Sequence, residues 1–229
     1  MALIECRRTS KIYVKGSLKT AALTDLDLTI RQGEFTVLSG PSGSGKTTAL
    51  NLMGGLDRPS SGSVAVHGKP LEKMPDNELA DFRLYSIGFI FQAYNLIPVL
   101  TAEENAEFIL LLQGVPEKKR RNKVRELFAE LHMEHLLHRR PNDLSGGQQQ
   151  RVAIIRAMAA SPALIIADEP TANLDTKTSR NLLEIMVKLN ETRKTTFVFS
   201  SHDPLVIEYA RRVVELKDGI LFSDTEAHR

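Results

Sequence analysis

The sequence contains a single cysteine, and this scarcity excludes an internal disulfide. Cys6 lies among strand-like residues, where we expect a small core or edge side chain in a reducing, cytosolic setting. An excess of one charge sign is also lacking, because 30 basic residues nearly balance 28 acidic ones and leave a net charge of +2. The composition therefore favours neither a nucleic acid nor an anionic membrane surface as a partner, and we expect no nucleic acid.

Long apolar runs are missing as well. The most apolar windows, at 108–112 and 163–167, are far shorter than the roughly 20 residues that a membrane-spanning helix requires. The N-terminal segment MALIECRRTSKIY has no apolar stretch behind a basic start, so no signal peptide is expected. The chain is therefore not expected to cross a membrane by itself, although it can still dock on a protein that does.

The apolar and polar residues alternate in patterns that are typical of an α/β protein. A content of 42% hydrophobic and 25% charged residues in 229 residues suits one globular domain without repeats. The strands expected from alternation and short apolar runs span 23–30, 34–39, 64–66, 88–91, 163–168 and 195–200. The expected helices span 47–54, 101–114, 117–131, 176–190 and 203–211, and a hairpin at 212–224 turns at Asp218-Gly219. Strands that alternate with helices predict a mostly parallel sheet with helices on both faces.

The middle of the chain differs, because it is helical without intervening strands. Val124, Leu127, Phe128 and Leu131 recur at the i, i+3, i+4, i+7 spacing of one helix face. We expect approximately 93–160 to form a helical subdomain inserted into the α/β core.

Residues 40–47 read GPSGSGKT and match the phosphate-loop pattern G-x-x-x-x-G-K-[ST]. The motif follows a predicted strand and begins a predicted helix, which is the context it requires. Glycines let backbone N–H groups approach phosphate oxygens, and the helix N-terminus adds the positive end of a dipole. We expect Lys46 to contact the β- and γ-phosphates and the Thr47 hydroxyl to help hold Mg²⁺. The expected phosphate-binding residues are Gly40, Pro41, Ser42, Gly43, Ser44, Gly45, Lys46, Thr47 and Thr48.

An acidic pair follows the most hydrophobic strand. Asp168 ends that strand, at the edge of the sheet where α/β proteins bind ligands, and is suited to hold Mg²⁺ through water. Glu169 is then suited to orient or deprotonate the attacking water. An adjacent pair of acids by itself is more typical of a helix cap or turn, and the phosphate loop upstream is the reason to favour catalysis.

Residues 144–148, hereafter the signature segment, read LSGGQ and lead into a strong helical pattern. Ser145 is a good N-cap residue, and its hydroxyl would face an anion together with the N–H groups of Gly146, Gly147 and Gln148. Two interpretations stay open from these residues alone, a capped helix and a second phosphate-binding element.

The signature segment resembles the signature of ABC transporter ATPases, and the resemblance extends from about residue 3 to 222. It implies a P-loop NTPase core with a mostly parallel sheet, an N-terminal antiparallel β subdomain and an inserted α-helical subdomain, as one domain over 1–229. It implies ATP and Mg²⁺ as ligands and ATP hydrolysis as the activity. The implied roles are adenine stacking for Tyr13, a link from Mg²⁺ and the γ-phosphate to the permease for Gln92, a γ-phosphate contact for His202, and a dimer-crossing loop for Asn173-Leu174-Asp175.

The same resemblance implies two partners. Two copies of the chain would hold two nucleotides head to tail, each between the phosphate loop of one copy and the signature segment of the other. An integral-membrane permease would contact residues 92–98, with the chain peripheral on the cytoplasmic face of the inner membrane. ATP binding would close the dimer and hydrolysis would open it.

Longer strings favour one branch of the family. GPSGSGKTTALNLMGGLD, FRLYSIGFIFQAYNLIP and LSGGQQQRVAIIRAM look most like the lipoprotein-release and macrolide-export branch. Ala49 and Ala172 depart from the residues expected there, Leu and Gly. The alternatives are a soluble ABC ATPase of the DNA-repair or translation type and a small-molecule P-loop kinase, and the signature segment argues against the kinase.

Two other clusters carry weaker signals. The run KKRR at 118–121 fits contact with lipid head groups, but we favour the solvated face of an amphipathic helix. His132, His135 and His138 are spaced by three, yet no acidic or cysteine ligand completes a metal set.

Overall fold

The computed structural model describes residues 1–226, so the last three residues of the predicted 1–229 domain lie outside the described part. Its larger sheet has the strand order β10-β9-β3-β8-β7-β6. Five of these strands run parallel, and only β10 pairs antiparallel, with β9. The bounds are β3 Phe35–Ser39, β6 Ile87–Ile90, β7 Leu164–Asp168, β8 Thr196–Ser200, β9 Arg212–Lys217 and β10 Ile220–Glu226. The mostly parallel sheet is therefore confirmed.

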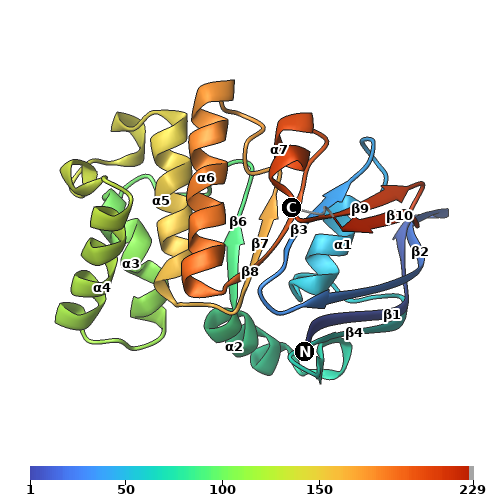
Figure 1. Ribbon diagram of the computed structural model, residues 1–229. Coiled ribbons are helices and arrows are strands. Elements are labelled where there is room, and N and C mark those ends of the chain that lie inside the picture. The colour runs from blue at the N-terminus through green and yellow to red at the C-terminus, as the bar shows by residue number, and fades with distance from the viewer. Residues whose placement is uncertain (227–229) are drawn as a thin grey trace.

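A second sheet, antiparallel and in the order β2-β1-β4-β5, lies on the opposite side of the core from the helical part (Figure 1). Its strands are β1 Ala2–Lys15, β2 Leu18–Arg31, β4 Ser61–Val66 and β5 Lys69–Pro70. The predicted strand at 23–30 covers only the inner part of β2. Cys6 was expected among strand-like residues, but no bounds were predicted for β1. The outer halves of both strands are exposed, so residues 12–20 lack the one-sided apolar alternation by which a strand is detected.

The described helices are α1 Lys46–Met53, α2 Asp76–Ser86, α3 Ala102–Leu112, α4 Glu117–Glu130, α5 Gly146–Ala159, α6 Thr176–Arg193 and α7 Pro204–Tyr209. Short 3-10 turns occur at Leu71–Lys73, Glu134–Leu136 and Pro141–Asp143. Helix α2 was missed because only Leu79 and Phe82 of its eleven residues are buried, which leaves a weak apolar stripe. Helix α7 ends before the predicted residue 211, since the Arg211 N–H donates to the Phe35 carbonyl at the sheet.

Helices α3, α4 and α5 gather at one end of the molecule, beside α6 and the larger sheet (Figure 1). Val124, Leu127 and Phe128 are buried here, as their spacing predicted. Phe35 and Phe199 join the same core with ring centroids 4.9 Å apart in an edge-to-face arrangement. A second core lies around α1, between the two sheets. The strands β3, β7 and β8 are therefore fixed by packing on both faces of the larger sheet.

The structure also shows where the basic run at 118–121 lies and whether a metal-binding cluster forms. On α4, Lys118, Lys119 and Arg121 are exposed, whereas Arg120 turns inward and pairs with Glu107 at 3.0 Å. Within residues 1–226 no three His, Cys, Asp or Glu side chains are placed to hold a metal ion together. The same residues contain no helix with the length and apolarity needed to span a membrane.

Candidate functional site

The phosphate loop connects β3 to α1 and needs glycine at two of its positions. Gly40 has φ +132°, and a Cβ there would lie 2.1 Å from the Leu216 carbonyl oxygen. Gly45 has φ +99°, and its Cβ would lie 2.5 Å from the Ala22 carbonyl oxygen. Only glycine fits such a backbone at such a close approach. The loop is therefore packed against the protein on one side, and its other side faces a pocket.

Lys46 reaches back over this loop from the first turn of α1. Its Nζ donates to the carbonyl oxygens of Gly40 at 2.8 Å and Pro41 at 2.9 Å. The side chain is buried, and in the described part of the chain its recorded partners are these neutral carbonyls rather than a carboxylate. A phosphate can therefore compete for this ammonium group without displacing a buried ion pair. The hydroxyl of Ser44, also buried in the loop, has no hydrogen-bond partner among the described residues.

The Asp168 carboxylate, at the end of β7, lies between the hydroxyl groups of Thr47 at the start of α1 and Ser200 at the end of β8. The Thr47 Oγ1 donates to its two carboxylate oxygens at 3.1 and 3.2 Å, and the Ser200 Oγ donates to Oδ1 at 2.6 Å. The register of β7 with β8 sets Asp168 opposite Ser200. A carboxylate beside a hydroxyl offers the hard oxygen ligands that Mg²⁺ prefers, so the residues present fit this ion.

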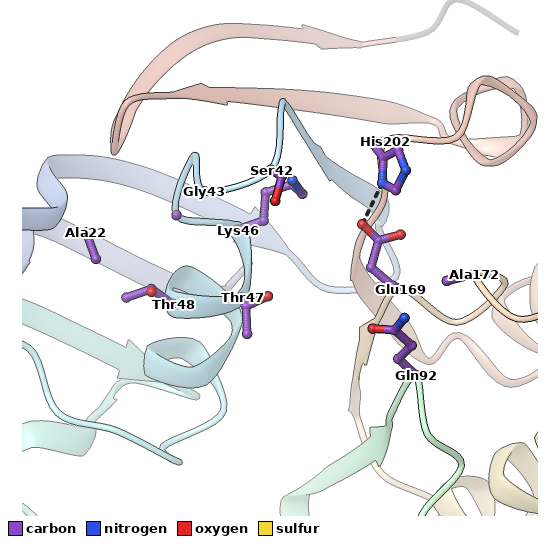
Figure 2. A pocket seen from close by; sticks show the side chains of 11 residues that line it. Ala22, Ser42, Gly43, Lys46, Thr47, Thr48, Gln92, Glu169, Ala172 and His202 are labelled. Atoms are coloured by element: carbon purple, nitrogen blue, oxygen red, sulfur yellow. Dashed lines mark hydrogen bonds and ion pairs between the residues drawn. The ribbon is translucent and has the colours of Figure 1, made fainter.

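Glu169 follows Asp168 in a left-handed backbone conformation, with φ +45°. Such a conformation costs a residue other than glycine about 1–3 kcal/mol and persists only where its surroundings hold it. The Glu169 N–H donates to the Ser200 Oγ at 3.0 Å, and its carboxylate Oε1 meets the His202 Nδ1 at 2.9 Å. Figure 2 shows this pair facing the phosphate loop across the pocket. The strained turn therefore aims the Glu169 carboxylate at the pocket.

The pocket has a volume of about 380 Å³ and two walls. The phosphate loop forms one wall, and Gln92, Glu169 and His202 form the other (Figure 2). The Gln92 carbonyl accepts from the Asn173 amide at 3.1 Å, which ties the segment after β6 to the segment after β7. The lining residues are Ala22, Ser42, Gly43, Gly45, Lys46, Thr47, Thr48, Gln92, Glu169, Ala172 and His202.

The signature segment does not line this pocket. Ser145 caps α5 in a capping box, in which its Oγ accepts from the Gln148 N–H and the Gln148 Oε1 accepts from the Ser145 N–H. The N-cap prediction is confirmed. Asp175 also lies outside the lining and caps α6, where hydrogen bonds from Thr178 lower the pKa of its carboxyl.

Tyr13 also lies outside the pocket lining, near the exposed end of β1. Its hydroxyl donates to the Asp57 Oδ2 at 3.0 Å, and the Lys11 ammonium lies 5.0 Å from its ring centroid. Lys11 also pairs with Asp57 at 2.5 Å. Burial alone would raise the pKa of Asp57, but the hydrogen bonds from Lys11, Arg58 and Tyr13 outweigh it and lower that pKa. The ring is thus held by an ordered polar cluster, and the residue as a whole is 42% exposed.

Two further residues escaped the sequence analysis, Ser200 beside the acidic pair and Arg156 outside the pocket lining. Ser200 joins Asp168 to Glu169, and only the β7–β8 register reveals it. Arg156 of α5 donates to the carbonyls of Tyr94, at 2.9 Å, and Asn95, both of which have positive φ. Burial lowers the pKa of Arg156, which is satisfied by these neutral acceptors. Its position on α5, eleven residues after the Ser145 cap, carried no sequence signal.

The chain is similar in sequence to a known protein family. A family model described as ABC transporter matches residues 23–172. The lipoprotein-releasing system ATP-binding protein LolD of Geobacter metallireducens is 43% identical over 97% of this chain and 99% of its own length. The macrolide export ATP-binding/permease protein MacB of Hahella chejuensis is 41% identical over 97% of this chain and 34% of its own length.

A solved structure agrees with these relatives. The dimeric structure of a post-hydrolysis state of the ATP-binding cassette MJ0796, bound to ADP and Pi, superposes with a TM-score of 0.91. It is 39% identical and covers 98% of both chains. The resemblance to the lipoprotein-release and macrolide-export branch is thereby confirmed. The chain belongs to the ABC transporter ATP-binding proteins: it is an ATPase and the ATP-binding subunit of a transporter.

Proposed function

We propose that two copies of this chain close head to tail over two ATP molecules and drive an integral-membrane permease of the lipoprotein-release or macrolide-export type. One observation carries the proposal: the signature segment forms a capped helix start, a place where backbone N–H groups are suited to an anion, yet it does not line the pocket of its own chain. A second copy turned by a two-fold axis can supply it. The dimeric form of the similar cassette supports this arrangement.

Within each copy, the phosphate loop holds the triphosphate. Backbone N–H groups and Lys46 contact the phosphates, and the unpartnered Ser44 hydroxyl is available to join them. Tyr13 stacks on the adenine ring. Thr47, Asp168 and Gln92 would hold Mg²⁺, which supplies neutralisation of phosphate charge when it is bound.

On the opposite wall, Glu169 orients the attacking water and accepts its proton as the oxygen bonds to the γ-phosphorus. The bond from the γ-phosphorus to the β–γ bridging oxygen breaks in the same displacement, and ADP leaves with that oxygen. His202 holds the Glu169 carboxylate at 2.9 Å and, being 71% exposed at its side chain, can also reach the γ-phosphate. Asp175 lies in the loop that crosses to the second copy. Ser145, Gly146, Gly147 and Gln148 of that copy close over the phosphates.

The permease surface lies next to Gln92. An apolar hollow of about 210 Å³ borders the 92–98 segment and is lined by Phe89, Phe91 and Ile109 among others. A helix of the permease docks here, so that closure of the dimer moves the helical subdomain at 93–160. The chain then works on the cytoplasmic face of the inner membrane.

The substitution Glu169→Gln tests the catalytic part. It keeps the shape of the side chain but cannot accept a proton, so turnover should fall at least about 100-fold while ATP is retained and a dimer accumulates. Gel filtration with ATP and a phosphate-release assay measure both effects. The matched control is Glu184→Gln, an exposed position on α6. Turnover at the parent's rate in Glu169→Gln would contradict the assignment.

Pull-down from detergent-solubilised membranes tests the transporter part. The tagged chain should recover an integral-membrane protein, and Glu169→Gln with ATP should recover more of it because the closed dimer persists. Recovery with ribosomes or DNA and no membrane protein would instead support the non-transport alternative.

A further inference from the structure

Gln150 is a polar side chain that the proposed mechanism has not used. It lies on α5, five residues after the Ser145 cap, and it is fully buried. Its Nε2 donates to the Pro170 carbonyl at 2.7 Å, and its Oε1 has no partner among the described residues. Buried amides are nearly always satisfied at both ends, so a half-satisfied one calls for a reason other than stability.

The acceptor of this hydrogen bond belongs to the turn that carries Glu169. Glu169 has φ +45°, and the proline after it further restricts its backbone. Its N–H is held by Ser200 at 3.0 Å, and its own carbonyl accepts from the Ala172 N–H at 3.2 Å. The bond from Gln150 holds the next carbonyl, so the strained residue is anchored on both sides.

The direction of this bond is determined by chemistry. The Pro170 carbonyl can only accept, so the amide of Gln150 must present its NH₂ group to it. An apolar side chain of the same length would fill the space but leave the carbonyl without its donor. The contact therefore depends on the amide and is not explained by packing alone.

We infer that Gln150 is a positioning residue that holds the Pro170 carbonyl and thereby aims the Glu169 carboxylate into the pocket. The inference rests on the proposed role of Glu169. It also gives α5 two tasks, since its N-terminus serves the nucleotide of the partner copy while Gln150 supports the acid of its own copy. A shift of α5 on dimer closure then reaches both pockets.

The first test is Gln150→Met, which keeps length and apolar volume and removes the donor. We expect kcat to fall about ten-fold with the KM for MgATP unchanged, because one buried hydrogen bond is lost at the acid and none at the phosphate loop. The matched control is Gln113→Met at the C-cap of α3, which removes a side-chain hydrogen bond to the Leu84 carbonyl of α2 and should leave kcat unchanged. An unchanged kcat in Gln150→Met would overturn the inference.

The second test is Gln150→Glu, followed by the pH profile of kcat relative to the parent. Burial raises the pKa of the new carboxyl, so at acidic pH it is protonated and donates to the Pro170 carbonyl. The kcat ratio should be near one there and fall as pH rises and the carboxylate repels that carbonyl. Taking the ratio to the parent at each pH removes the pH dependence that the two proteins share. A ratio that is flat with pH would overturn the inference, even if Gln150→Met fails to fold.

Glu169→Gln separates this inference from the proposed function. If Glu169→Gln is inactive and Gln150→Met is fully active, only the positioning role fails. If Glu169→Gln turns over normally, the catalytic assignment fails first.

Discussion

The hydroxyl of Ser200 offers the sharpest perturbation of the acidic pair, and the substitution is Ser200→Ala. The side chain is fully buried, donates to Asp168 at 2.6 Å and accepts from the Glu169 N–H at 3.0 Å. A hydrogen bond to a charged group contributes about 1.5–3 kcal/mol, and a donor left without its acceptor costs about 1–3 kcal/mol. Because these contributions overlap, we expect a loss of about 3 kcal/mol in the free energy of unfolding.

Two assays measure the effect. At about 2–4 °C per kcal/mol for a chain of this size, the melting temperature without nucleotide should fall by about 6–12 °C. The phosphate-release rate should fall at least about ten-fold at a temperature where the variant is folded, since both acids lose an anchor.

The control substitution is Thr9→Val. It removes a buried hydroxyl that donates to the Ser63 carbonyl at 2.7 Å in the antiparallel sheet, so it should lower the melting temperature without changing kcat. If Ser200→Ala melts within about 1 °C of the parent and hydrolyses ATP equally fast, the account of this cluster is wrong.

Three other predictions follow from single positions. Gly45→Ala places a Cβ 2.5 Å from the Ala22 carbonyl oxygen at φ +99°. Calorimetry should therefore show that the affinity for ATP is reduced at least about 100-fold, and binding at the parent's affinity would rule out the close approach. Tyr13→Ala should raise the KM for ATP about ten-fold, the usual scale of base stacking, and leave inhibition by tripolyphosphate unchanged; an equal loss for both ligands would remove Tyr13 from the adenine site. Burial raises the pKa of Cys6 from 9.0 to about 12, so iodoacetamide should modify it only after unfolding. The folded pKa lies above the unfolded one, so the thiol's contribution to stability is complete below about pH 9 and is lost between pH 9 and 12; Cys6→Ala should fall less steeply in melting temperature over that window.

Local rules explain what the sequence predicted well. Strand β3, the phosphate loop and helix α1 were predicted at almost their observed bounds. The reason is that β3 is a fully buried apolar strand and the glycines of the loop mark the turn after it. The hairpin at Asp218-Gly219 was also expected, and both residues have the positive φ that its turn needs. The N-cap at Ser145 was also expected, and the structure adds Gln148, three residues later, as its capping-box partner.

The contacts that the sequence did not predict join residues that are far apart in the chain. Ser200 meets Asp168 only because β7 and β8 pair in one register, and Gln150 meets Pro170 only because α5 packs beside the turn after β7. Both contacts join residues 20 or more positions apart, and neither leaves a periodic trace in the sequence. The roles assigned to Gln92, Glu169 and His202 stay predictions, although the structure brings all three to one pocket wall.

A mixing experiment tests the two-chain clamp most directly. Lys46→Ala removes the phosphate contact and Ser145→Arg blocks the signature segment, so each variant alone should be inactive. In a mixed dimer, one pocket combines the intact phosphate loop of one copy with the intact signature segment of the other. An equimolar mixture should therefore recover up to about a quarter of the parent's rate, since about half of the dimers are mixed and each has one complete pocket. A mixture as inactive as its components, or full activity of Ser145→Arg alone, would contradict a site shared between two chains.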